Sequence, residues 1–277
     1  MPRSRPALRP MSASLAGLLL LAVCLAGACT PKGTGKLDAP AAQAQWASFM
    51  AAGGAPTKAF TLSASLNLTA PQKSTRVLLK FWGNLDLPLR LDITASMGST
   101  FAMWREDSLG WMALYPLANQ AYTHPDTRKG LNRLGMPFPF GMKELAGVIT
   151  GNFAAFLPST YQSVKKTDKG LVYTLAAPCP VTSVTLDFEG KPIHLTGRGV
   201  EPWTVDLAEH TQADGSRPLA QKITLTTPGG VTAIFRVKKL ELSADPMAAE
   251  ALELPLPPQA RHIPLERAGE VRAPDMP

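Results

Sequence analysis

Phe60-Thr61-Leu62-Ser63-Ala64-Ser65-Leu66-Asn67-Leu68-Thr69 is the stretch that decides the fold. Apolar residues occupy every second position, and small polar residues stand between them. Because successive side chains of a strand point to opposite faces, this period of two predicts a strand with one apolar and one hydroxyl-rich face. The domain should therefore be built on a sheet that is covered on its apolar side.

Further strand-like segments follow at close intervals and are separated by short turns. They span 75–82, 87–94, 100–106 and 111–115, and later 171–176, 181–188, 192–197 and 203–207, with a final hairpin of 221–227 and 231–242. Short turns join antiparallel strands, whereas parallel neighbours need long crossover connections. We therefore expect an antiparallel meander.

Two short helices interrupt the strands. Asp126 is a candidate N-cap for a helix that runs to about Leu134, and a second helix spans roughly 141–149. Since a flat sheet of about ten strands tends to curl or split, we expect a mainly β (α+β) fold. It would be a strongly curved antiparallel sheet that forms an open half-barrel, with the helices across its concave side. The helical insert is very apolar, so it is either a plug or a lid over a cavity.

The N-terminus has the pattern of a bacterial lipoprotein signal peptide, residues 1–28. A basic start precedes an apolar run from Leu15 to Ala26, which is shorter than the roughly 20 residues of a membrane span. Small residues then lead into Cys29, as in a lipobox, where the cysteine is lipidated and becomes the new N-terminus. An ordinary cleaved signal with an incidental Cys29 is the alternative.

The remaining chain is expected to hold one domain. Residues 29–45 are small, polar and interrupted by Pro and Gly, which predicts a lipidated flexible tether. A short helix is expected at 46–52, a single domain at 46–265 and a disordered tail at 266–277. The sequence leaves open whether the Pro-rich C-terminal segment adds a strand.

Charge and cysteine content limit the partners. The first 28 residues hold three of the 28 basic residues and none of the 21 acidic ones, which leaves a formal charge of +4. Runs of Lys or Arg never exceed two residues and are not interleaved with aromatics, so no nucleic-acid partner is expected. A membrane surface is compatible with this charge. Cys179 would stand alone in the mature chain, as a half-buried turn residue without a disulfide partner.

Catalytic chemistry has little support in the sequence. The histidines are His124, His194, His210 and His262, and none forms a pair at metal-ligand spacing. No G-x-S-x-G, H-E-x-x-H or P-loop motif occurs. Glu201, Asp206, Glu209 and His210 are close in sequence but read as a solvated strand edge. We therefore expect neither an enzyme nor a metal, and no cofactor besides the covalent lipid on Cys29.

Two motifs resemble the LolB family of outer-membrane lipoprotein receptors. They are Thr94-Ala95-Ser96-Met97-Gly98-Ser99-Thr100 and Leu134-Gly135-Met136-Pro137-Phe138-Pro139. The hairpin 221–242 is also similar to the closing strands of that family, and the lipobox agrees independently. Two departures are a Met in place of Leu at Met97 and a longer tail from Ala244. The tail's Leu254–Pro257 is similar to the periplasmic carriers of the same fold.

The resemblance implies an outer-membrane protein, lipid-anchored and facing the periplasm, that takes lipoproteins from a LolA-like periplasmic carrier. Thr30, rather than Asp, follows the cysteine, which also favours the outer membrane. The resemblance implies that Met97 protrudes and contacts the receiving membrane during delivery, and that the concave interior binds acyl chains. We expect a monomer.

Acyl chains need a continuous apolar surface. Burying about 14 methylenes at roughly 0.8 kcal/mol each would contribute on the order of 10 kcal/mol before binding costs. The candidate lining residues are Phe60, Leu62, Leu66, Leu79, Phe81, Leu91, Trp104, Trp111, Leu134, Met136, Phe138, Phe140, Leu145, Val148 and Ile149. Each of them would also be apolar as simple core filler.

Two functions therefore stay open. The first is a lipoprotein receptor and insertion factor. The second is a lipid-binding or sensing lipoprotein of the same fold, or an accessory envelope protein without a transport role.

Overall fold

The computed structural model describes residues 38–51, 57–95, 98–136, 138–199, 201–212, 218–267, 271 and 273–274. They belong to one compact unit, Leu37–Pro277. Cys29 and Met97, the predicted lipidation site and membrane-contact residue, lie outside the described residues.

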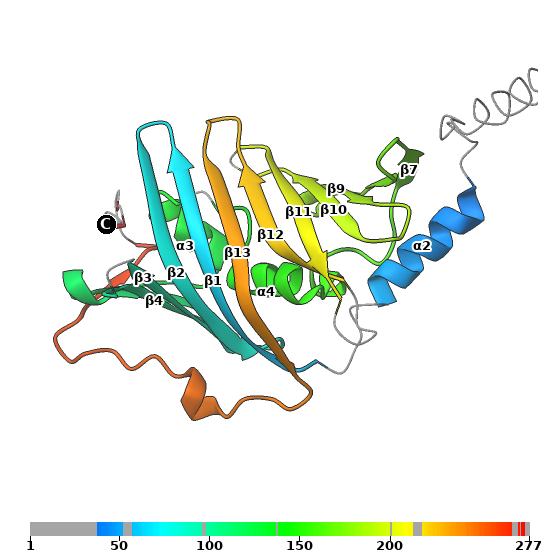
Figure 1. The fold of residues 1–277 in the computed structure, drawn as a ribbon. Coiled ribbons are helices and arrows are strands. Elements are labelled where there is room, and N and C mark those ends of the chain that lie inside the picture. The colour runs from blue at the N-terminus through cyan, green and yellow to red at the C-terminus, as the bar shows by residue number, and fades with distance from the viewer. Residues whose placement is uncertain are drawn as a thin grey trace, which may run out of the picture. The chain divides into compact units, whose positions relative to one another are not determined.

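A single curved and unclosed sheet forms the body of this unit (Figure 1). Its 14 strands follow the order β14-β6-β5-β4-β3-β2-β1-β13-β12-β11-β10-β9-β8-β7. Every neighbouring pair is antiparallel except β14 and β6, which are parallel. The predicted mainly β half-barrel is thereby confirmed. The strands are β1 (Ala59–Ala70), β2 (Lys73–Asn84), β3 (Leu89–Ala95), β4 (Thr100–Asp107), β5 (Gly110–Tyr115), β6 (Gln120–His124), β7 (Ser163–Lys166), β8 (Leu171–Thr174), β9 (Val181–Leu186), β10 (Pro192–Gly197), β11 (Trp203–Thr211), β12 (Leu219–Thr226), β13 (Thr232–Ser243) and β14 (Arg261–Pro264).

Strand β1 lies near the middle of the sheet and sets its inner face. Leu62 stands opposite Phe81 of β2 and Leu240 of β13, and the rings of Phe60 and Phe81 meet edge to face at 4.9 Å. The alternation quoted from the sequence is thus an inner row of apolar side chains. That row continues across the sheet and forms the main core.

Helices α3 (Thr127–Arg133) and α4 (Met142–Thr150) make up the predicted insert and lie against the sheet (Figure 1). Asp126 caps α3, since its Oδ1 accepts a hydrogen bond from Lys129 N at 2.9 Å. At the start of α4, Glu144 reaches back and accepts from Gly141 N at 2.8 Å. Both predicted helices are confirmed.

Helix α2 (Ala39–Ala51) begins earlier than the sequence indicates. We expected a helix only from Trp46, and a tether up to residue 45. The Ala-rich composition favours a helix, Asp38 Oδ1 accepts from Ala41 N, and Pro40 stands in the first turn, where its missing N–H does no harm. Ala42, Trp46 and Phe49 form its buried stripe.

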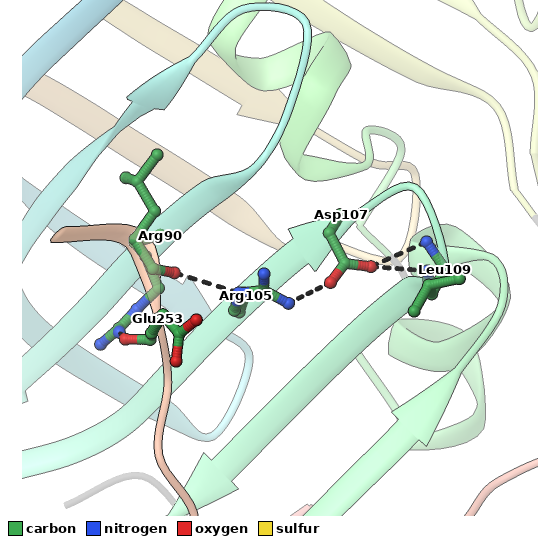
Figure 2. Close-up of polar contacts among 7 residues, drawn as sticks. Arg90, Arg105, Asp107, Leu109 and Glu253 are labelled. Carbon is green, nitrogen blue, oxygen red and sulfur yellow. Dashed lines mark hydrogen bonds and ion pairs between the residues drawn. The ribbon is translucent and has the colours of Figure 1, made fainter. Parts of the chain in front are cut away.

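The C-terminal segment crosses the outer face of β2–β6 and is called the strap here, residues 245–259. Trp82 Nε1 donates to Ala251 O at 3.1 Å. Arg105 Nε donates to Leu252 O at 3.0 Å, and Figure 2 shows the polar contacts of Arg105. Arg90, which is only 5% exposed, donates to Glu253 O. The chain then forms β14, so the tail does add a strand. Farther on, Ala273 N donates to Leu134 O at 3.1 Å, within the stretch expected to be disordered.

Candidate functional site

The predicted lining residues gather in one cluster between the concave face and the insert. Those at 0–7% exposed are Phe60, Leu62, Leu79, Phe81, Leu91, Trp111, Leu134, Phe140, Val148 and Ile149. Those half-buried against the same cluster are Leu66, Trp104, Met136, Phe138 and Leu145. The structure thus brings the whole predicted set together, while contact with an acyl chain stays a prediction.

The insert bridges the two sides of the curved sheet. Gly130 of α3 lies so close to Trp111 of β5 that a Cβ there would stand 2.7 Å from the indole ring. On the other side, the ring of Phe140 meets that of Trp203 of β11 at 5.1 Å. Insert side chains therefore pack directly on the sheet and cover its concavity.

Trp203 is the main site residue that the sequence analysis did not select. It begins a predicted strand, and only its position opposite Phe140 gives it importance. Its ring packs over Gly197, where a Cβ would stand 1.9 Å from the indole, so this backbone position needs glycine. Its Nε1 is buried and has no acceptor among the described residues.

A half-buried carboxylate holds the start of α4. Glu106 of β4 accepts a hydrogen bond through Oε2 from Lys143 N at 3.3 Å. Burial raises the pKa of Glu106 above its usual range, and the nearby Glu144 adds to this rise, while hydrogen bonds oppose it. Glu144 also lies 3.8 Å from Arg128 of α3, so the two helices share this polar contact.

A pocket of about 260 Å³ opens beside the insert. It lies between α3, the Phe138-Pro139 segment and the turns that follow β10 and β12. Its rim carries charged side chains, including Glu201, which the sequence analysis assigned to a solvated edge. Trp203 and Phe138 line the pocket and also belong to or pack against the core cluster. This pocket therefore borders the apolar interior.

The remaining polar candidates are dispersed. His194 Nδ1 and Asp206 Oδ1 are paired at 2.7 Å on the outer face, and Glu209 pairs with Arg236 at 3.2 Å. His210 Nε2 contacts Pro192 O at 2.9 Å, and burial lowers the pKa of His210. Cys179 is half-buried, as predicted. Among the described residues, no three His, Cys, Asp or Glu side chains are placed to hold a metal ion.

None of the described helices combines the length and the apolarity that a crossing of the bilayer requires.

Several solved structures have similar folds. A domain assigned to outer-membrane lipoprotein sorting from Vibrio parahaemolyticus has a TM-score of 0.52 and 12% identity, with 76% of this chain and 95% of that one covered. A LolA superfamily protein from Nitrosomonas europaea has a TM-score of 0.53 and 11% identity, with 79% and 98% covered. A DUF1329 family protein from Desulfovibrio piger has a TM-score of 0.54 and 9% identity, with 78% and 100% covered.

No protein-family model and no curated protein sequence matches the chain. At these low identities the structural likeness shows that the chain shares the fold of these three structures. The predicted LolA/LolB fold is thus confirmed as a fold.

Proposed function

We propose that this protein binds the acyl chains of lipoproteins between its concave sheet and the α3–α4 insert. The observation that carries the proposal is the continuous apolar contact between the insert and the sheet. Phe140 and Val148 of the insert region and Phe81 and Leu91 of the sheet belong to one cluster that the insert covers. An acyl chain that entered there would exchange one set of apolar contacts for another, so the insert acts as a displaceable lid.

The finer role that we propose is that of a LolB-like receptor at the outer membrane. Cys29 would carry the lipid anchor, Met97 would contact the receiving membrane, and a LolA-like periplasmic carrier would supply the lipoprotein. The lipobox and the motifs around residues 94–100 and 134–139 support this role. The fold of the lipoprotein-sorting domain is further support at the level of architecture. The function needs no catalytic group, because burial of a long acyl chain provides the binding free energy.

Dense packing favours a second candidate, an envelope protein whose interior is permanently filled. Leu131, Leu134 and Met142 of the insert are at most 2% exposed. Such a protein would sense or assist without accepting cargo.

The test is to mix the full chain with a lipoprotein loaded on the periplasmic carrier and to measure transfer, beside binding of a fluorescent fatty acid. Binding with transfer is expected. Binding without transfer would refute the receptor role and leave a lipid-binding protein. Absence of any binding would refute the proposal that acyl chains displace the insert, and it would favour an envelope protein with a permanently filled interior.

A further inference from the structure

Within the described ranges, the pocket beside the insert is lined by more unpaired cationic side chains than unpaired carboxylates. Lys129 of α3 and Arg198 of the β10–β11 turn line it, and neither forms an ion pair among the described residues. Arg128 also lines it but lies 3.8 Å from Glu144. Of the two acidic lining residues, Asp126 is engaged as the cap of α3, which leaves Glu201. Two uncommitted cations thus face one uncommitted carboxylate.

Two large apolar side chains line the pocket, and one of them has a buried N–H without a partner in the described part of the chain, behind the 198–199 turn. These side chains are Phe138 and Trp203, and they connect with the core cluster. Trp203 Nε1 would stand 4.0 Å from a Cβ at Gly199, which also lines the pocket, and this buried N–H has no acceptor among the described residues. Buried polar groups are usually paired, so a donor without a partner at a pocket indicates a missing acceptor.

The size of the pocket limits its occupant. At about 260 Å³ it is smaller than a pocket for a complete drug-sized ligand, which is about 300–1,000 Å³. It can hold a polar head and the first carbons of a chain. The rest of a long acyl chain would have to continue under the insert, where Phe140 meets Trp203.

We propose that this pocket holds the anionic head of an amphiphile, a carboxylate or phosphate attached to an acyl chain. Lys129 and Arg198 bind the charge at the rim, and Trp203 Nε1 donates to one of its oxygens once the exposed 198–199 turn shifts. This inference rests on the proposed function, because it needs the chain to enter beneath the lid. It adds the class of ligand, since a purely apolar site would not distinguish a charged head from an uncharged one.

The test compares hexadecanoate, hexadecyl phosphate and monohexadecanoylglycerol by displacement of a fluorescent acyl probe from the full chain, below their micelle concentrations. Inorganic phosphate alone is added as a fourth competitor. We expect the two anionic amphiphiles to bind about fivefold to tenfold more tightly than the uncharged ester. Inorganic phosphate should compete poorly, because it lacks the chain.

Variants separate the head from the chain. Lys129→Ala with Arg198→Ala should remove the preference for the anionic head and leave the affinity for the uncharged ester unchanged. Trp203→Phe, which keeps a ring and loses the N–H, should weaken the anionic ligands more than the uncharged ester. Glu201→Gln should tighten them. Lys169→Ala with Lys238→Ala is the matched control, because it removes the same charge from exposed positions outside the pocket.

Equal affinity of the wild-type chain for all three amphiphiles would overturn the head-group site while the proposed function stands. The head-group site would also be overturned if the control variant weakened the anionic ligands as much as the Lys129→Ala, Arg198→Ala variant does. The overall charge of the protein would then suffice to explain the preference for an anionic head. Failure of every amphiphile to bind would refute the proposed function, and this inference with it.

Discussion

The contact between Gly130 and Trp111 predicts how firmly the α3–α4 insert is held against the sheet. In Gly130→Ala the new methyl group would meet the Trp111 ring at 2.7 and 2.8 Å. Trp111 cannot yield easily, because it is buried and its ring meets Trp104 edge to face at 5.5 Å. Alanine favours the helix by up to about 1 kcal/mol, but overpacking costs about 1–3 kcal/mol. We therefore expect the substitution to favour detachment of α3 from the sheet by about 1–2 kcal/mol.

Hydrogen exchange measures this shift directly. The amides of α3 should exchange about fivefold to thirtyfold faster in Gly130→Ala, while those of β1 should be unchanged. Arg133→Ala is the control, because Arg133 is exposed on the same helix. Slower exchange in Gly130→Ala would refute the reasoning, since it would mean that helix propensity outweighs the clash and that Trp111 does not limit the fit of the lid.

Three further predictions concern the groups that hold the unit together. Burial raises the pKa of Glu106 above 4.5, so the folded state holds that proton more tightly and stability falls as the pH rises from about 4.5 through the raised pKa. Glu106→Gln should therefore stabilise more at about pH 7.5 than at about pH 4.5 in urea titrations, and an equal effect at both would contradict the role of burial. Arg90→Ala should lower the free energy of unfolding by about 2–3 kcal/mol, because charged hydrogen bonds to Glu253 O and Asp92 are lost. It should also make the strap more susceptible to limited proteolysis. Unchanged cleavage would show that Arg90 does not anchor the strap. Trp46 is buried and its Nε1 donates to Ser159 O at 2.9 Å, so Trp46→Ala should destabilise the fold by about 3–5 kcal/mol. Trp46→Phe, which keeps a ring, should destabilise it much less. Equal urea midpoints for both variants and the wild type would show that α2 does not contribute to the stability of the core.

The alternation of apolar residues predicted the sheet well wherever only one face of a strand is covered. β1 and the first part of β2, which the strap meets only near Trp82 and Asn84, are of this kind, with inner residues buried and outer ones mostly polar or exposed. β6 was missed for a physical reason. Ala121 packs under the strap while Tyr122 faces the main core, so both faces are covered and no alternation marks the strand. The same cover explains why Met103 and Trp104 are both apolar although they are neighbours in a strand: Met103 packs under the strap and Trp104 against the concave core.

The sequence predicted which apolar residues form the candidate site, but it did not predict which of them meet in space. Apolar strand positions identified Phe60 or Leu91 without any knowledge of their neighbours. Trp203 could not be selected, because its value depends on Phe140, which is distant in sequence and meets it only after the insert crosses the concavity. Likewise, Lys129 and Arg198 approach one pocket only because α3 and the β10–β11 turn face each other.

The strap makes the sheet mechanically unequal. On the side of β2–β6 the outer face carries Met112 and Leu114 under the strap, and β14 extends the edge. On the side of β9–β12 the outer row includes His194, Asp206 and Thr224 and is polar. The β2–β6 side thus has three layers, namely the insert, the sheet and the strap, whereas among the described residues the β9–β12 side has only the insert and the sheet. Any deformation of the sheet that is needed to admit an acyl chain should therefore be concentrated in β9–β12. That is the side of the sheet that holds Trp203.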